Sequence, residues 1–233
     1  MSSAIPVSLP LLLFYGGTFD PFHNGHLAIA RAARDELQVP VHLLPSADPP
    51  HRPPPGANAG QRAGMLDSIA DAEPGLQVDR RELVRAERAP GSRSYSVDTL
   101  RELRREHGGQ QPLAWLIGAD SFVSLPSWRE WEALFGLAHF VVAERPGISL
   151  DRDLASGLAK ASAGRWVADP AALSECPAGK LFRLHQPLQP ESATEVRRRI
   201  ASGQPWRDLV PEPVAGYIDD YALYARSGES GPV

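Results

Sequence analysis

Residues 11–31 constrain the fold more than any other stretch of this sequence, and they read LLLFYGGTFDPFHNGHLAIAR. The apolar run Leu11–Tyr15 ends at Gly16 and Gly17, and an amphipathic pattern begins around His23 and His26. This succession predicts a buried strand, a tight turn and the start of a helix, where free backbone N–H groups favour an anion. No serine elbow or cysteine accompanies the two histidines. The stretch therefore suits holding phosphates rather than attacking a substrate.

A second predicted strand follows closely. Residues 27–37 are rich in Ala, Arg and Leu and predict a helix, and Val39–Leu44 predicts a strand. Strand, helix and strand in this succession form a βαβ unit, whose two strands are parallel. Ligands of such sheets bind beyond the carboxyl ends of the strands, where residues 16–26 fall. The sequence therefore predicts an α/β fold with a doubly wound, mostly parallel, Rossmann-like sheet.

The rest of the chain alternates between helical and strand patterns. We find no internal repeat and no linker, so we expect one domain over residues 11–224, with a flexible leader at 1–10 and a flexible tail at 225–233. The patterns predict helices at 61–72, 97–107, 128–134, 192–202 and 214–224, strands at 76–83, 113–117, 138–143 and 180–184, a polar loop at 86–93, and a helix then a short strand within 150–169.

Composition excludes several classes of protein. The net charge of −4 gives no basic field that would attract nucleic acid. The single cysteine, Cys176, excludes an internal disulfide framework and fits a reducing compartment. The apolar run at Leu9–Tyr15 is too short to span a bilayer and has no basic flank typical of a signal peptide. We expect a cytoplasmic protein without membrane or nucleic-acid partners, and the sequence leaves its oligomeric state open.

The motif GGTFDPFHNGHL at 16–27 resembles the GGTFDPxHxGHL signature of the HxGH nucleotidyltransferases. SATEVRRRI at 192–200 is similar to their second signature, (S/T)xxR at a helix start. Across 11–224, further segments follow the order found in bacterial nicotinate-nucleotide adenylyltransferases: PPHRP at 49–53, SYSVDTL at 94–100, IGADSF at 117–122, PSW at 126–128 and LVPEPVAGYIDDYALY at 209–224.

The resemblance implies a reaction in which ATP and nicotinate mononucleotide give deamido-NAD and pyrophosphate. The attacking phosphate oxygen is already ionised at neutral pH, so no general base is needed, and the ATP phosphates are expected to hold Mg²⁺. The enzyme must align two anions and stabilise the charge that grows on the α-phosphate. Two alternatives stay open: a preference for nicotinamide mononucleotide, and a nucleotide-binding regulator that has lost turnover. Pantetheine-phosphate adenylyltransferases are shorter and lack the PPHR and PSW segments.

The resemblance assigns catalysis to His23, His26 and Arg197. Capping or core histidines, and a zinc site, are the alternatives for the two histidines, although the sequence HNGH lacks HExxH spacing and a third ligand. The expected ATP-binding residues come from the first signature, the IGADSF segment and the second signature. They are Gly16, Gly17, Thr18, Phe19, Gly25, Gly118, Asp120, Ser192 and Thr194.

Some of these ATP-site residues also have a structural explanation. Ser192 and Glu195 have the spacing of a capping box, which accounts for both without a ligand. Thr194 and Arg197 are three residues apart, so we expect them on one helix face, where they would meet the ATP phosphates. Arg198 and Arg199 are expected to pair with Glu195 on a solvated face. For Asp120, at a strand's carboxyl end, the choice is between a ribose hydroxyl and a helix cap.

The expected mononucleotide-binding residues lie in later loops. His51 and Arg52 lie within the stiff proline-rich loop 45–55, and the alternative for them is a surface basic pair. Tyr95 and Ser96 would offer backbone N–H groups to the pyridine carboxylate, with Ser96 as the alternative N-cap of its helix. Trp128 would stack on the pyridine ring or pack in the core.

Overall fold

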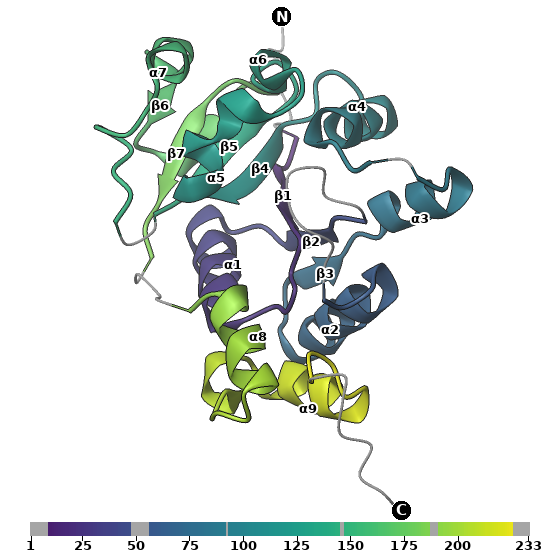
Figure 1. Ribbon diagram of the computed structural model, residues 1–233. Coiled ribbons are helices and arrows are strands. Elements are labelled where there is room, and N and C mark those ends of the chain that lie inside the picture. The colour runs from purple at the N-terminus through teal and green to yellow at the C-terminus, as the bar shows by residue number, and fades with distance from the viewer. Residues whose placement is uncertain (1–8, 48–55, 92, 145–146, 187–190, 226–233) are drawn as a thin grey trace, which may run out of the picture.

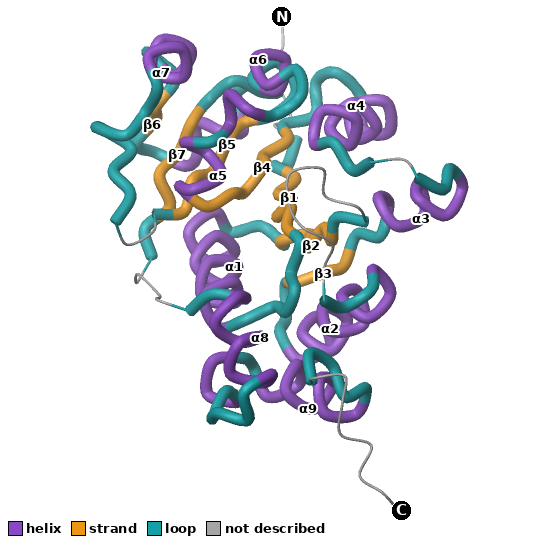
Figure 2. The backbone as a smooth tube through the Cα atoms, in the orientation of Figure 1, coloured by secondary structure: helices purple, strands orange, loops and turns teal. Residues whose placement is uncertain are grey.

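The computed structural model describes residues 9–47, 56–91, 93–144, 147–186 and 191–225. Its centre is a seven-stranded parallel sheet in the order β3-β2-β1-β4-β5-β7-β6, visible as neighbouring strands in Figure 1 and Figure 2. The predicted doubly wound fold is confirmed. The strands are β1 (Leu12–Gly17), β2 (Val41–Pro45), β3 (Leu76–Val78), β4 (Leu113–Gly118), β5 (His139–Ala143), β6 (Trp166–Val167) and β7 (Leu181–Leu184).

Helices cover both faces of the sheet because successive strand residues point to opposite sides. Leu13 and Leu116 face one core, which α1, α2, α8 and α9 close; Phe14 and Trp115 face the other, which α4, α5, α6 and α7 close. The helices are α1 (Asn24–Leu37), α2 (Ala59–Ala72), α3 (Arg81–Arg88), α4 (Ser96–His107), α5 (Ala119–Val123), α6 (Trp131–Leu134), α7 (Ser156–Ser162), α8 (Ala193–Ala201) and α9 (Glu212–Asp220), with 3₁₀ turns η1 (Leu125–Ser127), η2 (Pro170–Ser174) and η3 (Arg207–Leu209).

Residues 79–88 depart from the prediction. The expected strand to Leu83 stops at Val78, and α3 takes in residues 81–88, which include only the first three residues of the predicted polar loop. The Asp79 carboxylate accepts the Arg81 N–H at 2.9 Å, and Glu82 and Leu83 are buried. Leu83 therefore packs on a helix face rather than continuing the strand.

Two more helices were placed wrongly. The predicted helix at 128–134 is interrupted, because Trp128 is extended and Glu130 adopts a left-handed conformation with φ 50°. The predicted helix at 214–224 ends at Asp220, and residues 221–224 form turns. α1 begins at Asn24, three residues before the predicted start, so both histidines of the motif lie at its first turn. No helix in the described ranges is long and apolar enough to cross a membrane.

Candidate active site

A cleft of about 820 Å³ opens beyond the carboxyl ends of β1 and β4, where the sheet order reverses. Most residues predicted for the site line it. From the first signature these are Gly16, Gly17, Thr18, Phe19, His23 and His26; from the later segments they are Tyr95, Ser96, Gly118, Asp120, Trp128, Ser192, Thr194 and Arg197.

Three predicted site residues are not placed in this cleft. Gly25 is buried inside the first turn of α1 and is not among the lining residues, so it serves the helix rather than the cleft surface. His51 and Arg52 lie outside the described residues.

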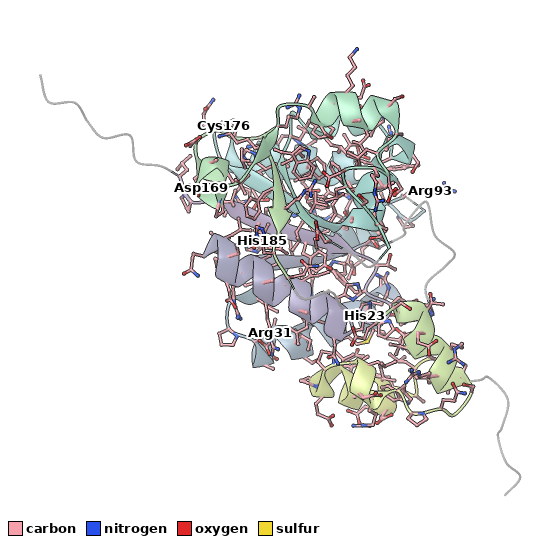
Figure 3. The ribbon with its side chains drawn as sticks, turned by 90° about the vertical axis from the view of Figure 1, so that its left-hand side faces the viewer. His23, Arg31, Arg93, Asp169, Cys176 and His185 are labelled. Carbon is pink, nitrogen blue, oxygen red and sulfur yellow. The ribbon has the colours of Figure 1, made fainter. Side chains whose placement is uncertain are left out.

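The two histidines form a stacked pair at the start of α1. His23 is the N-cap and is 2% exposed, and Figure 3 shows it at the end of α1 near the C-terminal helices. The backbone N–H of His23 donates to Nδ1 of His26 at 3.3 Å, and the ring centroids are 3.7 Å apart. Since Nδ1 of His26 is an acceptor, the neutral ring carries its proton on Nε2. The capping interpretation therefore holds for His26, and it fixes a ring that also lines the cleft.

Close packing explains the glycine pair before the histidines. A Cβ on Gly16 would lie 2.5 Å from Cζ2 of Trp115, and one on Gly17 would lie 2.8 Å from the ring of Phe19. Phe19 itself has a left-handed φ of 51°. Nε1 of Trp115 is buried beside the cleft without a hydrogen-bond partner in the described part of the chain.

The start of α8 presents Thr194 and Arg197 together, as predicted from their spacing. Nη2 of Arg197 donates to Oγ1 of Thr194 at 3.4 Å, and Nη1 donates to the backbone carbonyl of Asp20. Nη1 also lies 3.5 Å from Oδ2 of Asp20. Arg197 is therefore held at the cleft by two different segments.

The capping box predicted at Ser192 is only half present. Oγ of Ser192 accepts the N–H of Glu195 at 3.2 Å. The carboxylate of Glu195 instead accepts hydrogen bonds from Arg198 and Arg199, which lower its pKa to about 2. The predicted pairing of these arginines with Glu195 is confirmed.

The other side of the cleft is formed by the start of α4 and by the segment after β4. Tyr95, not Ser96, is the N-cap of α4, because its carbonyl accepts the N–H of Asp98 at 3.0 Å while Ser96 is already helical. The Arg129 guanidinium lies 4.9 Å from the centre of the Tyr95 ring. Trp128 is half-buried and both lines the cleft and packs on the core, so the two interpretations of it are compatible.

Asp120 does not cap a helix. The N-cap of α5 is Gly118, and Asp120 lies in the first turn of that helix while lining the cleft. The cap interpretation is therefore wrong.

A buried polar network beneath the cleft was missed by the sequence reasoning. Arg62 is 1% exposed and donates to the carbonyls of Thr18 at 2.7 Å, Ala47 at 3.1 Å and Ala57 at 3.2 Å. Burial lowers the pKa of its guanidinium. The Asp20 carboxylate accepts the backbone N–H groups of Gly56 and Ala57, which precede α2. Asp20 belongs to the first signature, and this was the sequence signal that could have pointed to the network.

A second buried carboxylate lies beside α4. Glu82 lines the cleft at 4% exposure, and its Oε1 accepts the hydroxyl of Thr99 at 2.6 Å. Burial raises the pKa of Glu82. It was missed because the helix that carries it, α3, was predicted as strand and loop.

Several known proteins resemble this chain in sequence or in fold. Residues 14–199 match the cytidylyltransferase-like family. A Stenotrophomonas maltophilia protein named "probable nicotinate-nucleotide adenylyltransferase" is 60% identical, over 93% of this chain and 97% of that protein. A Xylella fastidiosa protein of the same name is 52% identical, over 92% and 96%. A Plasmodium falciparum nicotinic acid mononucleotide adenylyltransferase complexed with NaAD has the same fold, with a TM-score of 0.69 and 15% identity over 92% of this chain and 97% of that one.

The match covers most of the chain, and both bacterial relatives align over nearly their full lengths. The chain belongs to the cytidylyltransferase-like family and, within it, to the nicotinate-nucleotide adenylyltransferases.

Proposed function

We propose that this enzyme transfers the AMP moiety of ATP to nicotinate mononucleotide and releases deamido-NAD and pyrophosphate. Its substrates are small molecules, and we place the reaction in the cytoplasm. A phosphate oxygen of the mononucleotide attacks the α-phosphorus of ATP, and the bond from that phosphorus to the bridging oxygen of pyrophosphate breaks. The electron pair leaves with pyrophosphate. No proton needs to move, because the attacking phosphate is already ionised.

One observation carries this proposal: three of the longer helices begin at the same cleft. The N-caps of α1, α4 and α8 are His23, Tyr95 and Ser192, and all three line it. Free N–H groups and the macrodipole make each helix start favourable for an anion. A cleft of about 820 Å³ that offers several such positions suits two phosphorylated substrates.

The residues near α1 and α8 would act on the ATP half. Nε2 of His26, with His23 stacked on it, would donate to the α-phosphate as its charge grows, and Arg197 with Thr194 would bind the departing phosphates. The backbone of Gly16, Gly17, Thr18 and Phe19 would approach ATP closely, with Asp120 on a ribose hydroxyl, Gly118 beside it and Ser192 at the helix start. Gly25 would contribute only by shaping the turn.

The opposite wall would bind the mononucleotide. The N–H groups at Tyr95 and Ser96 would meet the pyridine carboxylate, and the exposed part of Trp128 would stack on the ring. His51 and Arg52 stay predictions for the same half of the site.

Mg²⁺ would enter as part of the MgATP substrate. The described residues include no group of three or more His, Cys, Asp or Glu side chains placed to hold an ion. The three phosphates of ATP supply the oxygen ligands that Mg²⁺ prefers.

The test is a comparison of the two mononucleotides with purified enzyme, ATP and Mg²⁺. We expect pyrophosphate release with both, and a higher kcat/KM for nicotinate mononucleotide, because a carboxylate and not a carboxamide gains from a helix start. Equal or reversed preference would contradict the substrate assignment. A protein that binds ATP but releases no pyrophosphate with either mononucleotide would be a regulator.

A further inference from the structure

After α9 the chain makes an unusual turn beside residues that line the cleft. Ala222 and Tyr224 both have left-handed conformations, with φ of 47° and 65°, although neither is glycine. Between them Leu223 is 7% exposed, and its N–H donates to the carbonyl of Ile218 at 2.9 Å. Such conformations persist only where surrounding contacts hold them.

The Tyr224 hydroxyl reaches a carboxylate 204 residues earlier in the chain. It donates to Oδ1 of Asp20 at 2.8 Å. Burial raises the pKa of Tyr224, so the hydroxyl keeps its proton and remains a donor. Asp20 itself is 5% exposed and lines the cleft.

Asp20 also joins two other segments to this tyrosine. Its Oδ2 accepts the N–H of Gly56 at 2.8 Å, and its Oδ1 accepts the N–H of Ala57 at 3.0 Å. Nη1 of Arg197 lies 3.5 Å from Oδ2. A Cβ on Gly56 would lie 3.0 Å from the Tyr224 ring and 3.5 Å from Cδ of Arg197, so these side chains pack around one point.

We propose that Tyr224 is a positioning residue that keeps the guanidinium of Arg197 available to ATP by sharing the negative charge of Asp20. The inference rests on the proposed function, because it concerns the same cleft. With the hydroxyl in place, Asp20 accepts from three neutral donors, and Arg197 forms only a long ion pair with Oδ2, at 3.5 Å. Without it, Oδ1 loses a donor, and the arginine is the strongest remaining partner. The ion pair between Arg197 and Asp20 would then shorten, and the guanidinium would move away from the position proposed for the phosphates.

The test is Tyr224→Phe, alone and combined with Arg197→Ala. We expect Tyr224→Phe to lower kcat by roughly 10- to 100-fold, as a small displacement of a catalytic group does, with KM for the mononucleotide within about twofold. In the Arg197→Ala background the same change should cost less than about twofold, because there is no arginine left to misplace. Unchanged kcat in the single variant, or equal losses in both backgrounds, would overturn the proposal.

Tyr221→Phe is the matched control. Tyr221 belongs to the same turn segment but is 57% exposed and does not line the cleft. It should leave kcat unchanged. If Tyr224→Phe does not fold, Gly56→Ala gives a second test, because its Cβ displaces the Tyr224 ring while keeping the hydroxyl. The same non-additivity with Arg197→Ala is expected, and additive losses would overturn the inference.

A failure of the proposed function can be told apart from a failure of this inference. If the wild-type enzyme forms no dinucleotide, the proposed function fails. The same single and double variants are then compared by their dissociation constants for MgATP. Tyr224→Phe should then weaken MgATP binding in the wild-type background and not in Arg197→Ala. Weakening of the same size in both would overturn the role of Tyr224.

Discussion

His26 has a structural task in its ring and, under the proposed function, a chemical one. Its Nδ1 accepts the N–H of His23, and this contact leaves Nε2 to face a ligand. We expect His26→Ala to lower kcat by about 10²- to 10³-fold, the usual effect of removing a donor to a developing charge. KM for the mononucleotide should change little, because the contact strengthens only in the transition state. Steady-state kinetics with both substrates varied would measure this.

A second variant separates the catalytic role proposed for the His26 ring from its role in capping α1. His26→Gln keeps an acceptor for the His23 N–H, so it should preserve the melting temperature while kcat stays low. His185→Ala is the control, because His185 pairs with Glu36 on α1 and does not line the cleft. Losses of equal size in kcat and in mononucleotide affinity would make His26 a ground-state contact only.

Site residues could be predicted where the spacing along the chain was short. The pairs His23–His26 and Thr194–Arg197 are three residues apart, and helix geometry alone places each on one face. Tyr224 meets Asp20 across 204 residues, and Arg62 is enclosed by carbonyls of three separate segments. No local pattern encodes these contacts, because they depend on how the helices pack over the sheet.

At the scale of elements, β1 and β4 pair side by side, and the Trp115 ring of β4 packs against Gly16 at the end of β1. A Cβ there would lie 2.5 Å from Cζ2 of Trp115, a side chain that is 2% exposed. We expect Gly16→Ala to lower the free energy of unfolding by about 1–3 kcal/mol, the usual cost of overpacking a core. Urea denaturation would measure it.

The control for this variant is Gly216→Ala. Gly216 lies inside α9, and a Cβ there would meet nothing within 4 Å. Alanine should therefore stabilise the helix by roughly 1 kcal/mol. A stable Gly16→Ala protein would show that the Trp115 ring can shift.

His139 gives the contact between β5 and β7 a pH dependence. Its Nε2 lies 2.8 Å from the carbonyl of Cys176, and its Nδ1 accepts the N–H of Lys180 at 3.0 Å, so both nitrogens are used by the neutral ring. Burial lowers its pKa below the ordinary 6.5. Below pH 6.5 the unfolded chain binds a proton that the folded chain does not, so stability should fall as the pH decreases, by no more than about 1.4 kcal/mol per pH unit.

The measurement is the free energy of unfolding at pH 8 and pH 5.5. His139→Gln should be less stable than the wild type at pH 8, yet lose less between the two values. Burial also lowers the pKa of His42, so part of the slope should remain in the variant. An unchanged slope would mean that His139 does not titrate differently on unfolding.

Element prediction failed where segments were short or their pattern was ambiguous. The strands in the centre of the sheet are continuous apolar runs and were found within one or two residues of their ends. β3 has only three residues, so the apolar pattern appeared to continue into Leu83 of α3. The helix predicted at 128–134 was broken by the left-handed Glu130, a conformation that tertiary contacts rather than propensity select.

For the whole molecule, the sequence predicted a parallel doubly wound sheet but not its strand order. β7 pairs with β5, and β6 pairs with β7 at the edge, so the last two strands are inserted out of chain order. The order of these edge strands depends on which face of the sheet each connecting segment covers. The location of the cleft was predictable nevertheless, because it needs only β1, α1 and the parallel neighbour β4.

The source of Mg²⁺ is also a property of the whole molecule. Within the described residues no three His, Cys, Asp or Glu side chains gather to hold an ion. Asp20, which lines the cleft, already accepts from Gly56, Ala57 and Tyr224. A metal ion bound by the protein alone would stabilise the ligand-free fold, whereas a metal ion carried by ATP acts only when ATP is bound. Removing the metal would therefore lower the melting temperature of the ligand-free enzyme in the first case and leave it unchanged in the second.

We therefore expect EDTA to stop pyrophosphate release while leaving the melting temperature of the ligand-free enzyme unchanged. Excess Mg²⁺ should restore turnover fully, because the chelator removes nothing from the folded chain. Mg²⁺ alone should not raise the melting temperature, but Mg²⁺ with ATP should raise it above ATP with EDTA, since a ligand stabilises the state that binds it. Differential scanning fluorimetry beside the pyrophosphate assay measures both. A melting temperature that falls on chelation without ATP would require a resident metal held by the protein.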